Sequence, residues 1–306
     1  MTYNQLWKRL TAIYNEREAQ AIVRTVLDAL FGMSLTDICL GKVTQLSADD
    51  TTRLEKIMQR LEKSEPVQYV LGAGWFAGRL FDVAPGVLIP RPETEDLVKW
   101  ACDEAKEKEK EDNSKEERGK EEKEVPKKGE EAPHPSILDI GTGSGCIAIT
   151  VALALPQARV TAWDISTDAL AIAAGNAHRL GASVRFEHQD ALSAPDDEER
   201  WDVIVSNPPY ICDRERADMS DNVLSYEPEL ALFVPDSDPL LFYRAIARYA
   251  SKALKPGGRL LFETNTAYVH EVAQTMANEG FTAIEVRNDC FGKPRMVKGA
   301  FLKVKK

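Results

Sequence analysis

Residues 136–306 alternate between short apolar runs and longer segments with helical spacing, and this alternation limits the fold more than any other feature. Five runs predict buried strands, at 137–140, 159–163, 184–186, 203–205 and 259–263. Helices are predicted at 146–155, 169–180, 240–254 and 267–279. Strands that alternate with helices form a mostly parallel sheet covered on both faces. The sequence therefore predicts an α/β domain over 136–306, whose late strands at 281–287 and 296–304 can form an antiparallel hairpin at the sheet edge.

Residues 1–73 predict a separate small helical bundle. Asn15, Ser34 and Ser47 each have an acidic residue three positions later and are candidate N-caps. The spacing of Leu54, Ile57, Met58 and Leu61 is that of one apolar helix face. Packing alone explains each of these residues, although the bundle as a unit could recognise a partner.

Two segments separate the bundle from the α/β domain. Residues 74–102 predict a hairpin followed by a connecting helix that starts near Glu93. Residues 103–135 are almost all Lys and Glu, a composition that cannot bury apolar surface and predicts disorder or a solvated single helix. We interpret 103–135 as a linker or insertion, and we expect deletion of 104–132 to leave activity largely unchanged.

Length and composition exclude several classes of protein. The 306 residues suggest two domains and include no apolar run long enough to span a bilayer. The start has no basic region leading into an apolar one, so we expect no signal peptide and a cytoplasmic, monomeric protein. The five cysteines are scattered singly, which indicates neither a metal site nor a disulfide framework. A net charge of −10 disfavours tight, non-specific binding to nucleic acid.

A glycine-rich turn follows the first strand of the α/β domain. Glycines let the backbone turn tightly and approach a ligand closely. Asp139 before the turn and a third glycine at Gly145 favour a loop for S-adenosyl-L-methionine (AdoMet) over the GxGxxG loop of dinucleotide-binding folds. A purely structural turn is the alternative. The candidate cofactor-binding residues are Asp139, Gly141, Thr142, Gly143, Ser144 and Gly145.

Acidic residues end the next two strands. Asp164 lies roughly 20 residues after the glycine turn, where a carboxylate can accept both ribose hydroxyls. Asp190 ends the third strand, where an acceptor can meet the amino group of adenine. Alone, Asp164 could be a helix N-cap and Asp190 a surface residue near a turn. Together with the glycine turn, they outline one nucleoside pocket.

The fourth strand ends in Asn207-Pro208-Pro209-Tyr210. Two prolines cannot continue a central strand, so a stiff loop holds these residues at the carboxyl end of the sheet, where ligands bind in open α/β folds. The side-chain oxygen of Asn207 and the carbonyl of Pro208 can accept the two hydrogens of a planar NH2 group, while Tyr210 offers a ring face. Such clamping orients a poorly nucleophilic nitrogen for methyl transfer. The motif alone leaves a glutamine amide and an adenine amine equally open.

The sequence resembles the release factor glutamine methyltransferases, the HemK/PrmC family. Four segments carry the resemblance: Val87–Glu95, Asp139–Gly145, Asn207–Tyr210 and Tyr226–Leu232. It implies a class I (Rossmann-like) AdoMet-dependent methyltransferase domain, with an N-terminal bundle that docks the release factor. It also implies that Gly141–Gly145, Asp164 and Asn207 bind AdoMet, with Asp190 and Ala191 beside the adenine.

The resemblance further implies which residues act on the substrate. Asn207, Pro208 and Tyr210 are the candidate catalytic residues, and the candidate glutamine-binding residues are Asn207, Pro208, Pro209, Tyr210, Arg91 and Glu93. No metal is expected. The predicted reaction methylates the amide nitrogen of the glutamine in the Gly-Gly-Gln motif of a release factor.

Three other functions share part of this pattern. An N6-adenine nucleic-acid methyltransferase uses an Asn/Asp-Pro-Pro-Tyr motif on a flipped base, but the acidic balance and the absence of an obvious basic recognition region disfavour it. A glutamine methyltransferase of a ribosomal protein fits Ile89–Glu95 less well. A non-catalytic AdoMet-binding scaffold is disfavoured because Asn207–Tyr210 is intact.

Overall fold

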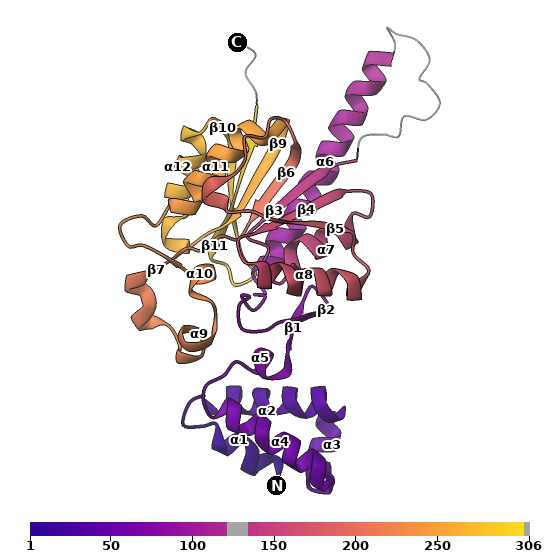
Figure 1. Cartoon of the computed structure of the whole chain (residues 1–306), viewed down its shortest axis with the longest axis vertical. Coiled ribbons are helices and arrows are strands. Elements are labelled where there is room, and N and C mark those ends of the chain that lie inside the picture. Colours follow the sequence, from indigo (N-terminus) through magenta and orange to yellow (C-terminus); the bar gives the residue numbers. More distant parts are fainter. Residues whose placement is uncertain (121–133, 303–306) are drawn as a thin grey trace. The chain divides into compact units, whose positions relative to one another are not determined.

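The computed structural model of the chain describes residues 1–120 and 134–302, and for 112–120 it describes the backbone alone. Contacts divide these residues into two units. Unit 1 consists of Met1–Ala73 together with Val83–Pro85 and Asp218–Glu227, and unit 2 contains the other described residues. Figure 1 labels the elements of both units.

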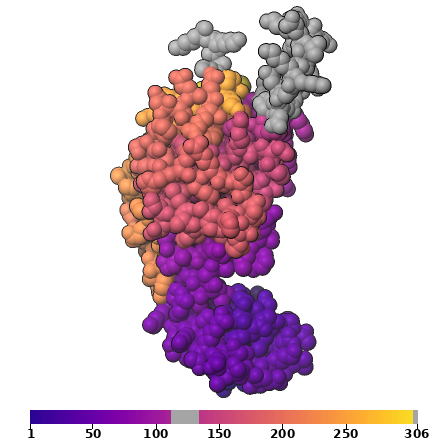
Figure 2. Space-filling view, turned by 45° about the vertical axis from the view of Figure 1, so that its right-hand side comes forward, coloured from indigo at the N-terminus to yellow at the C-terminus, as the bar shows by residue number. Residues whose placement is uncertain are grey.

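Unit 1 is helical, and its N-terminal residues form the indigo mass in Figure 2. Its elements are α1 (Tyr3–Arg9), α2 (Glu16–Phe31), α3 (Leu35–Cys39), η1 (Lys42–Gln45), α4 (Ala48–Leu61), α5 (Val67–Leu71) and α9 (Asp221–Tyr226). The side chains of Asn15, Ser34 and Ser47 each accept a hydrogen bond from a backbone N–H in the first turn, as predicted. The apolar faces of α1, α2 and α4 meet in one core that includes Leu54 and Met58. The prediction of a helical bundle over these residues is confirmed.

Unit 2 contains a seven-stranded sheet in the order β10-β11-β9-β6-β3-β4-β5. Its strands are β3 (Ser136–Ile140), β4 (Arg159–Asp164), β5 (Val184–His188), β6 (Trp201–Ser206), β9 (Leu254–Glu263), β10 (Phe281–Asn288) and β11 (Pro294–Phe301). Neighbours among β5, β4, β3, β6 and β9 pair in parallel, while β11 pairs antiparallel with both β9 and β10. The predicted α/β architecture is confirmed, with the late pair at one edge.

Helices cover both faces of this sheet (Figure 1). The helices are α6 (Thr94–Lys120), α7 (Cys146–Ala154), α8 (Thr167–Leu180), α11 (Leu241–Ala253) and α12 (Val269–Asn278). Ile137, Val203 and Val205 face α6 and α7, whereas Leu138 and Ile204, which alternate with them, face α11 and α12. Successive strand residues point to opposite faces, so apolar residues stand side by side in strands that are buried on both sides, as in Val203-Ile204-Val205.

The strand order places a topological switch between β3 and β6. The connections after β3 lead to β4 and β5 on one side, and those after β6 lead to β9 on the other. Ligands of open α/β folds bind outside the carboxyl ends of the strands at such a point. The glycine turn follows β3 and Asn207 follows β6, so the two strongest motifs of the sequence lie at this switch.

Shorter elements complete unit 2. A two-stranded hairpin, β1 (Ala73–Phe76) and β2 (Arg79–Asp82), precedes α6 and confirms the predicted hairpin. The stretch between Tyr210 and residue 240, for which the sequence analysis names no helix or strand, contains several short elements. They are β7 (Ile211–Cys212), η3 (Asp213–Asp218), α10 (Glu229–Leu232) and β8 (Phe233–Val234), in addition to α9 of unit 1. They are too short to have a readable period, and β7 is held by parallel pairing with β8. The remaining elements are η2 (Ala191–Ser193) and η4 (Thr266–Tyr268).

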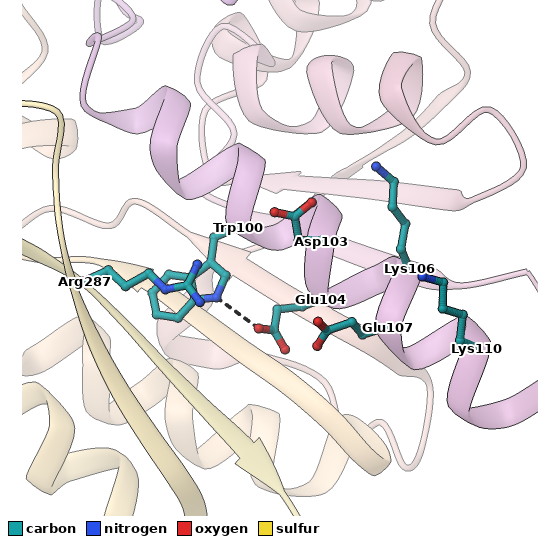
Figure 3. Close-up of a pocket in the computed structure, with 7 residues that line it drawn as sticks. All are labelled: Trp100, Asp103, Glu104, Lys106, Glu107, Lys110 and Arg287. Atoms are coloured by element: carbon teal, nitrogen blue, oxygen red, sulfur yellow. Dashed lines mark hydrogen bonds between the residues drawn. The ribbon is translucent and has the colours of Figure 1, made fainter.

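The Lys/Glu-rich segment begins inside a packed helix, which corrects the sequence-based interpretation. α6 continues through residue 103, and Glu104 is buried where solvated surface was predicted. Its carboxylate accepts from Trp100 Nε1 at 3.0 Å (Figure 3). The same carboxylate pairs with Arg259 at 3.1 Å and with Lys298 at 2.6 Å. Composition could not reveal this because the two cations come from distant strands. The predicted linker residues 121–133 lie outside the described residues.

Within the described ranges, 1–120 and 134–302, no helix is long and apolar enough to cross a membrane. The same ranges hold no group of three or more His, Cys, Asp or Glu side chains that could bind a metal ion.

Candidate functional site

The glycine turn after β3 has the backbone conformation that its sequence predicts. Gly141, Gly143 and Gly145 have φ angles of 78°, 54° and 82°, a region that L side chains rarely adopt. The N–H groups of Gly141 and Thr142 both donate to the carbonyl of Trp163 on β4 at 2.9 Å, which fixes the turn against the sheet. No heavy atom of the described chain, apart from their immediate neighbours, lies within 4 Å of a Cβ built on Gly141 or Gly143. The turn therefore faces open space at these two positions.

Gly145 is required for packing rather than for ligand access. A Cβ at this position would lie 2.7 Å from Cδ1 of Ile149 and 3.0 Å from Cβ of Ala173 on α8. Ser144 is buried, and its carbonyl accepts from the amide of Asn176 at 2.9 Å. The C-terminal half of the turn is thus held by α7 and α8, while its first half faces the open space.

Asp139 is fully buried at the end of β3. Its Oδ2 accepts from Thr142 Oγ1 at 2.7 Å and from the N–H of Ala148 at 3.2 Å, while Oδ1 has no partner among the described residues. Burial raises the pKa of this carboxyl group to about 7. The structure therefore places Asp139 behind the turn, where its carboxylate closes the loop around Thr142.

The two predicted acids after β4 and β5 lie at the same sheet edge. Asp164 Oδ2 accepts from the N–H of Gly143 at 2.8 Å and Oδ1 accepts from the N–H of Ser166 at 2.9 Å. Asp190 accepts from the N–H of Leu192 at 2.8 Å and caps η2, and the half-buried Ala191 follows it. A carboxylate oxygen has more than one acceptor position, so these bonds leave capacity for a ligand.

Sheet register explains why these residues meet. Ile140 of β3 pairs with both Trp163 of β4 and Ser206 of β6. Gly141, Asp164 and Asn207 directly follow these three paired residues in the chain. They therefore lie in one row at the carboxyl edge of the sheet. The structure thus brings together the three predicted cofactor contacts that sequence alone could place only at separate strand ends.

The Asn-Pro-Pro-Tyr segment leaves the sheet directly after β6. Pro208 is buried, while Asn207, Pro209 and Tyr210 are partly exposed. The N–H of Tyr210 donates to the carbonyl of Leu232 at 3.2 Å, and its own carbonyl accepts from the amide of Asn265 at 3.3 Å. Two rigid prolines and these two hydrogen bonds restrain the segment, as a clamp for a planar group requires.

Polar groups that the sequence analysis missed surround this segment. Tyr210 donates its hydroxyl to Glu263 Oε1 at 3.2 Å and accepts from Arg295 Nη1 at 3.2 Å. Asn207 Nδ2 donates to Thr94 Oγ1 at 3.4 Å. Burial, reinforced by the charge of Glu263, raises the pKa of the Tyr210 phenol, so Tyr210 is neutral at physiological pH. Glu263 ends the strand next to β6, a position that could have been found only once the strand order was known.

The segment before α6 supplies the other predicted substrate contacts. Arg91 and Glu93 are partly exposed, and backbone bonds from Thr94 to Arg91 and from Asp96 to Glu93 start the helix. Glu93 lies close enough to raise the pKa of Glu263. Glu93 also raises the pKa of Tyr210, and the substrate contacts of Arg91 and Glu93 stay predictions.

A hollow of about 250 Å³ lies elsewhere, along α6 (Figure 3). Its lining consists mainly of charged side chains, namely Trp100, Asp103, Glu104, Lys106, Glu107, Lys110 and Arg287. None of the predicted site residues lines it. Ligand sites are lined mostly by apolar groups with a few placed polar ones, so we assign no binding role to this hollow.

The strand-edge residues fit a nucleoside ligand such as AdoMet. Gly141 and Gly143 face open space, and Asp164 stands beside them with a carboxylate, the group that takes ribose hydroxyls in dinucleotide-binding folds. The family model for the methyltransferase small domain matches residues 126–225, which include the glycine turn, both acids and Asn207. Unit 2 is thus an AdoMet-dependent methyltransferase domain.

Known proteins define the family more narrowly. The family model for the PrmC N-terminal domain matches residues 3–72. The release factor glutamine methyltransferase of Bacteroides thetaiotaomicron is 44% identical, over 94% of this chain and 95% of its own. The enzyme of the same name from Flavobacterium psychrophilum is 37% identical, over 97% of each chain, and that from Chlorobaculum tepidum is 36% identical, over 93% and 92%. The chain belongs to the release factor glutamine methyltransferase family.

Proposed function

We propose that this chain transfers the methyl group of AdoMet to the side-chain amide nitrogen of the glutamine in the Gly-Gly-Gln motif of peptide chain release factors. The observation that carries the proposal is the position of Asn207-Pro208-Pro209-Tyr210, which follows β6 beside the glycine turn at the topological switch. Family membership across nearly the whole chain supports glutamine over adenine as the acceptor.

The residues of the clamp account for the chemistry. Asn207 Oδ1 and the carbonyl of Pro208 accept the two hydrogens of the substrate NH2 group, which orients the nitrogen and favours the positive charge that develops there. Tyr210 packs its neutral ring against the flat amide. AdoMet, when bound, supplies an electrophilic sulfonium methyl group. The nitrogen gains its bond to carbon as the carbon–sulfur bond breaks, and the resulting cationic amide loses a proton to water, so no general base is needed beforehand.

We assign cofactor binding to the turn and the acids that follow the strands. Gly141 and Gly143 let the backbone approach the ligand, Asp164 accepts the ribose hydroxyls, and Asp190 with Ala191 borders the adenine. The other members of this set, which include Asp139, Thr142, Ser144 and Gly145, hold the turn in shape from behind.

The substrate protein is assigned to surfaces outside the clamp. Residues 1–73 form the domain that recognises the release factor, residues 74–102 connect it to the methyltransferase domain at 136–306, and Arg91 and Glu93 border the glutamine. The protein acts as a cytoplasmic monomer that binds neither membrane nor nucleic acid.

Mass spectrometry tests the proposal. Release factor incubated with AdoMet and the enzyme should gain one methyl group, of about 14 Da, on the glutamine of its Gly-Gly-Gln tryptic peptide. Asn207→Ala should abolish transfer while leaving the circular dichroism spectrum unchanged, because Asn207 is partly exposed and its side chain makes one long hydrogen bond, to Thr94, among the described residues. An unmodified peptide together with methylated DNA or RNA would refute the proposal in favour of an adenine methyltransferase.

A further inference from the structure

A buried carboxylate lies directly beside the clamp. Phe262 of β9 pairs with Ser206 of β6, so Glu263 and Asn207 are the next residues of neighbouring strands. Glu263 is completely buried. Its Oε2 accepts from Thr94 Oγ1 at 2.6 Å and its Oε1 accepts from the Tyr210 hydroxyl at 3.2 Å. The carboxylate thus bonds directly to Tyr210 at one end of the Asn207–Tyr210 segment, and it reaches Asn207 at the other end only through Thr94.

Thr94 joins this carboxylate to Asn207. Thr94 starts α6, is 2% exposed, and accepts from Asn207 Nδ2 at 3.4 Å. A threonine hydroxyl has a single proton, and an ionised carboxylate can only accept. When Glu263 is ionised, the proton of Thr94 must point to Glu263, and only lone pairs of Thr94 remain for Asn207. The donor group of Asn207 is therefore required to face Thr94.

The single proton of Thr94 therefore fixes the orientation of the Asn207 amide. With Nδ2 on Thr94, the acceptor Oδ1 points to the other side. A substrate NH2 group presents hydrogens and needs an acceptor there. If the amide were flipped, an NH2 group would meet an NH2 group, and no hydrogen bond could form between them.

We propose that Glu263 and Thr94 are positioning residues that set the polarity of Asn207, so that its oxygen rather than its nitrogen faces the substrate amide. The inference deepens the proposed function and rests on it. Protonation of Glu263 removes the constraint. A protonated Oε2 can donate to Thr94, whose own proton is then free to donate to Asn207 Oδ1, and this arrangement turns the oxygen away from the substrate.

The surroundings of Glu263 set the pH at which this happens. Burial raises the pKa of Glu263 to about 7. The hydrogen bond from Thr94 lowers the pKa, the charge of Glu93 raises it, and Arg295 lowers it from β11.

Two neutral hydroxyl groups also face Glu263. Tyr210 donates to its carboxylate and Tyr243 donates to its backbone carbonyl, each at 3.2 Å. Arg295 is itself paired with Asp289 at 3.0 Å. The rate of transfer should therefore fall as pH decreases through about 7, because the ionised form of Glu263 is the one that orients Asn207.

Two threonine variants separate positioning from packing. Thr94→Val removes the hydroxyl at nearly constant volume, and we expect kcat to fall roughly tenfold or more at saturating AdoMet, with little change in AdoMet affinity. Thr94→Ser keeps the hydroxyl and should restore most of the rate. Thr150→Val is the matched control, because Thr150 is also buried but its hydroxyl has no partner among the described residues. Its rate should equal that of the wild type.

The pH profile tests the role of Glu263. Glu263→Gln cannot ionise, so the fall in rate below pH 7 should disappear, and the rate at pH 8 should lie below that of the wild type. Equal rates for Thr94→Val and Thr94→Ser, or an unchanged acidic limb in Glu263→Gln, would overturn the inference. Failure of the wild type to methylate the release factor would instead overturn the proposed function and, with it, the role assigned to this pair.

Discussion

The ion cluster at Glu104 predicts that a residue of the Lys/Glu-rich segment is essential for stability. Glu104→Gln keeps the size of the side chain and can still accept from Trp100 Nε1, but it removes the negative charge between Arg259 and Lys298. The side chains of both cations are only 13% exposed, so neither can regain full hydration. The substitution therefore leaves two poorly solvated cations facing a neutral amide.

The expected cost follows from the remaining partners. Removing one member of a buried ion pair costs about 3–5 kcal/mol. Arg259 keeps Glu111 at 3.3 Å and Lys298 keeps Glu285 at 3.2 Å, which offsets part of this loss. We expect Glu104→Gln to lower the free energy of unfolding by about 2–4 kcal/mol, which corresponds to a decrease in Tm of roughly 5–15 °C for a domain of this size.

Thermal unfolding followed by tryptophan emission measures the effect, because Trp100 lies in the cluster. Glu107→Gln is the matched control, since Glu107 is exposed on the same helix and should change Tm by less than about 2 °C. Equal Tm values for the two variants would refute the assignment. The same reasoning corrects the expectation for deletion of 104–132, which removes Glu104 and should now destabilise the protein.

Three further predictions concern the strand edge. Gly145→Ala places a Cβ 2.7 Å from Ile149 Cδ1 at a φ of +82°, so the glycine turn must shift. AdoMet affinity measured by calorimetry should therefore fall at least tenfold. Gly175→Ala, in the open middle of α8, is the control and should not alter that affinity. Asp139 has a folded-state pKa of about 7 against 3.8 when unfolded, so its contribution to stability is full below about pH 4 and is lost as pH rises through 7. Asp139→Asn should therefore weaken the dependence of the free energy of unfolding on pH, as measured by urea unfolding at several pH values. A pH dependence equal to that of the wild type would contradict the role assigned to Asp139. Asn176→Ala should lower Tm by several degrees, because this buried amide bonds the backbone of both Asp82 and Ser144.

The sequence predicted the frame of the site because its signals are local. A glycine turn needs positive φ angles, and Gly141, Gly143 and Gly145 all have them. Val203, Ile204 and Val205 form a continuous apolar run because β6 is buried on both faces, and two prolines follow the strand. Alternating strands and helices were sufficient to infer a parallel sheet, and the right-handed connections of such sheets bring the strand ends to one edge.

The supporting contacts could not be predicted because they join residues far apart in sequence. Thr94 and Glu263 are 169 positions apart, and Asn207 and Thr94 are 113 apart. Neither residue has an unusual local pattern: a threonine before an acidic helix start is an ordinary N-terminal residue, and a glutamate at a strand end is an ordinary surface residue. Their pairing follows only from the order β9-β6-β3, which single-sequence periodicity does not specify.

Asp164, at the end of β4, holds the glycine turn in place and is also the predicted ribose contact. Asp164 was predicted from spacing as a ribose contact, with a capping role as the alternative, and the structure shows it bonded to Gly143 and Ser166. These roles do not compete, because two N–H donors occupy only part of the acceptor capacity of a carboxylate. Bonds from Asp164 to the turn fix the loop before a ligand arrives, so less conformational entropy is lost on binding. The loop role of Asp164 is thus observed, and its contact with the ribose stays a prediction that the remaining acceptor capacity of the carboxylate allows.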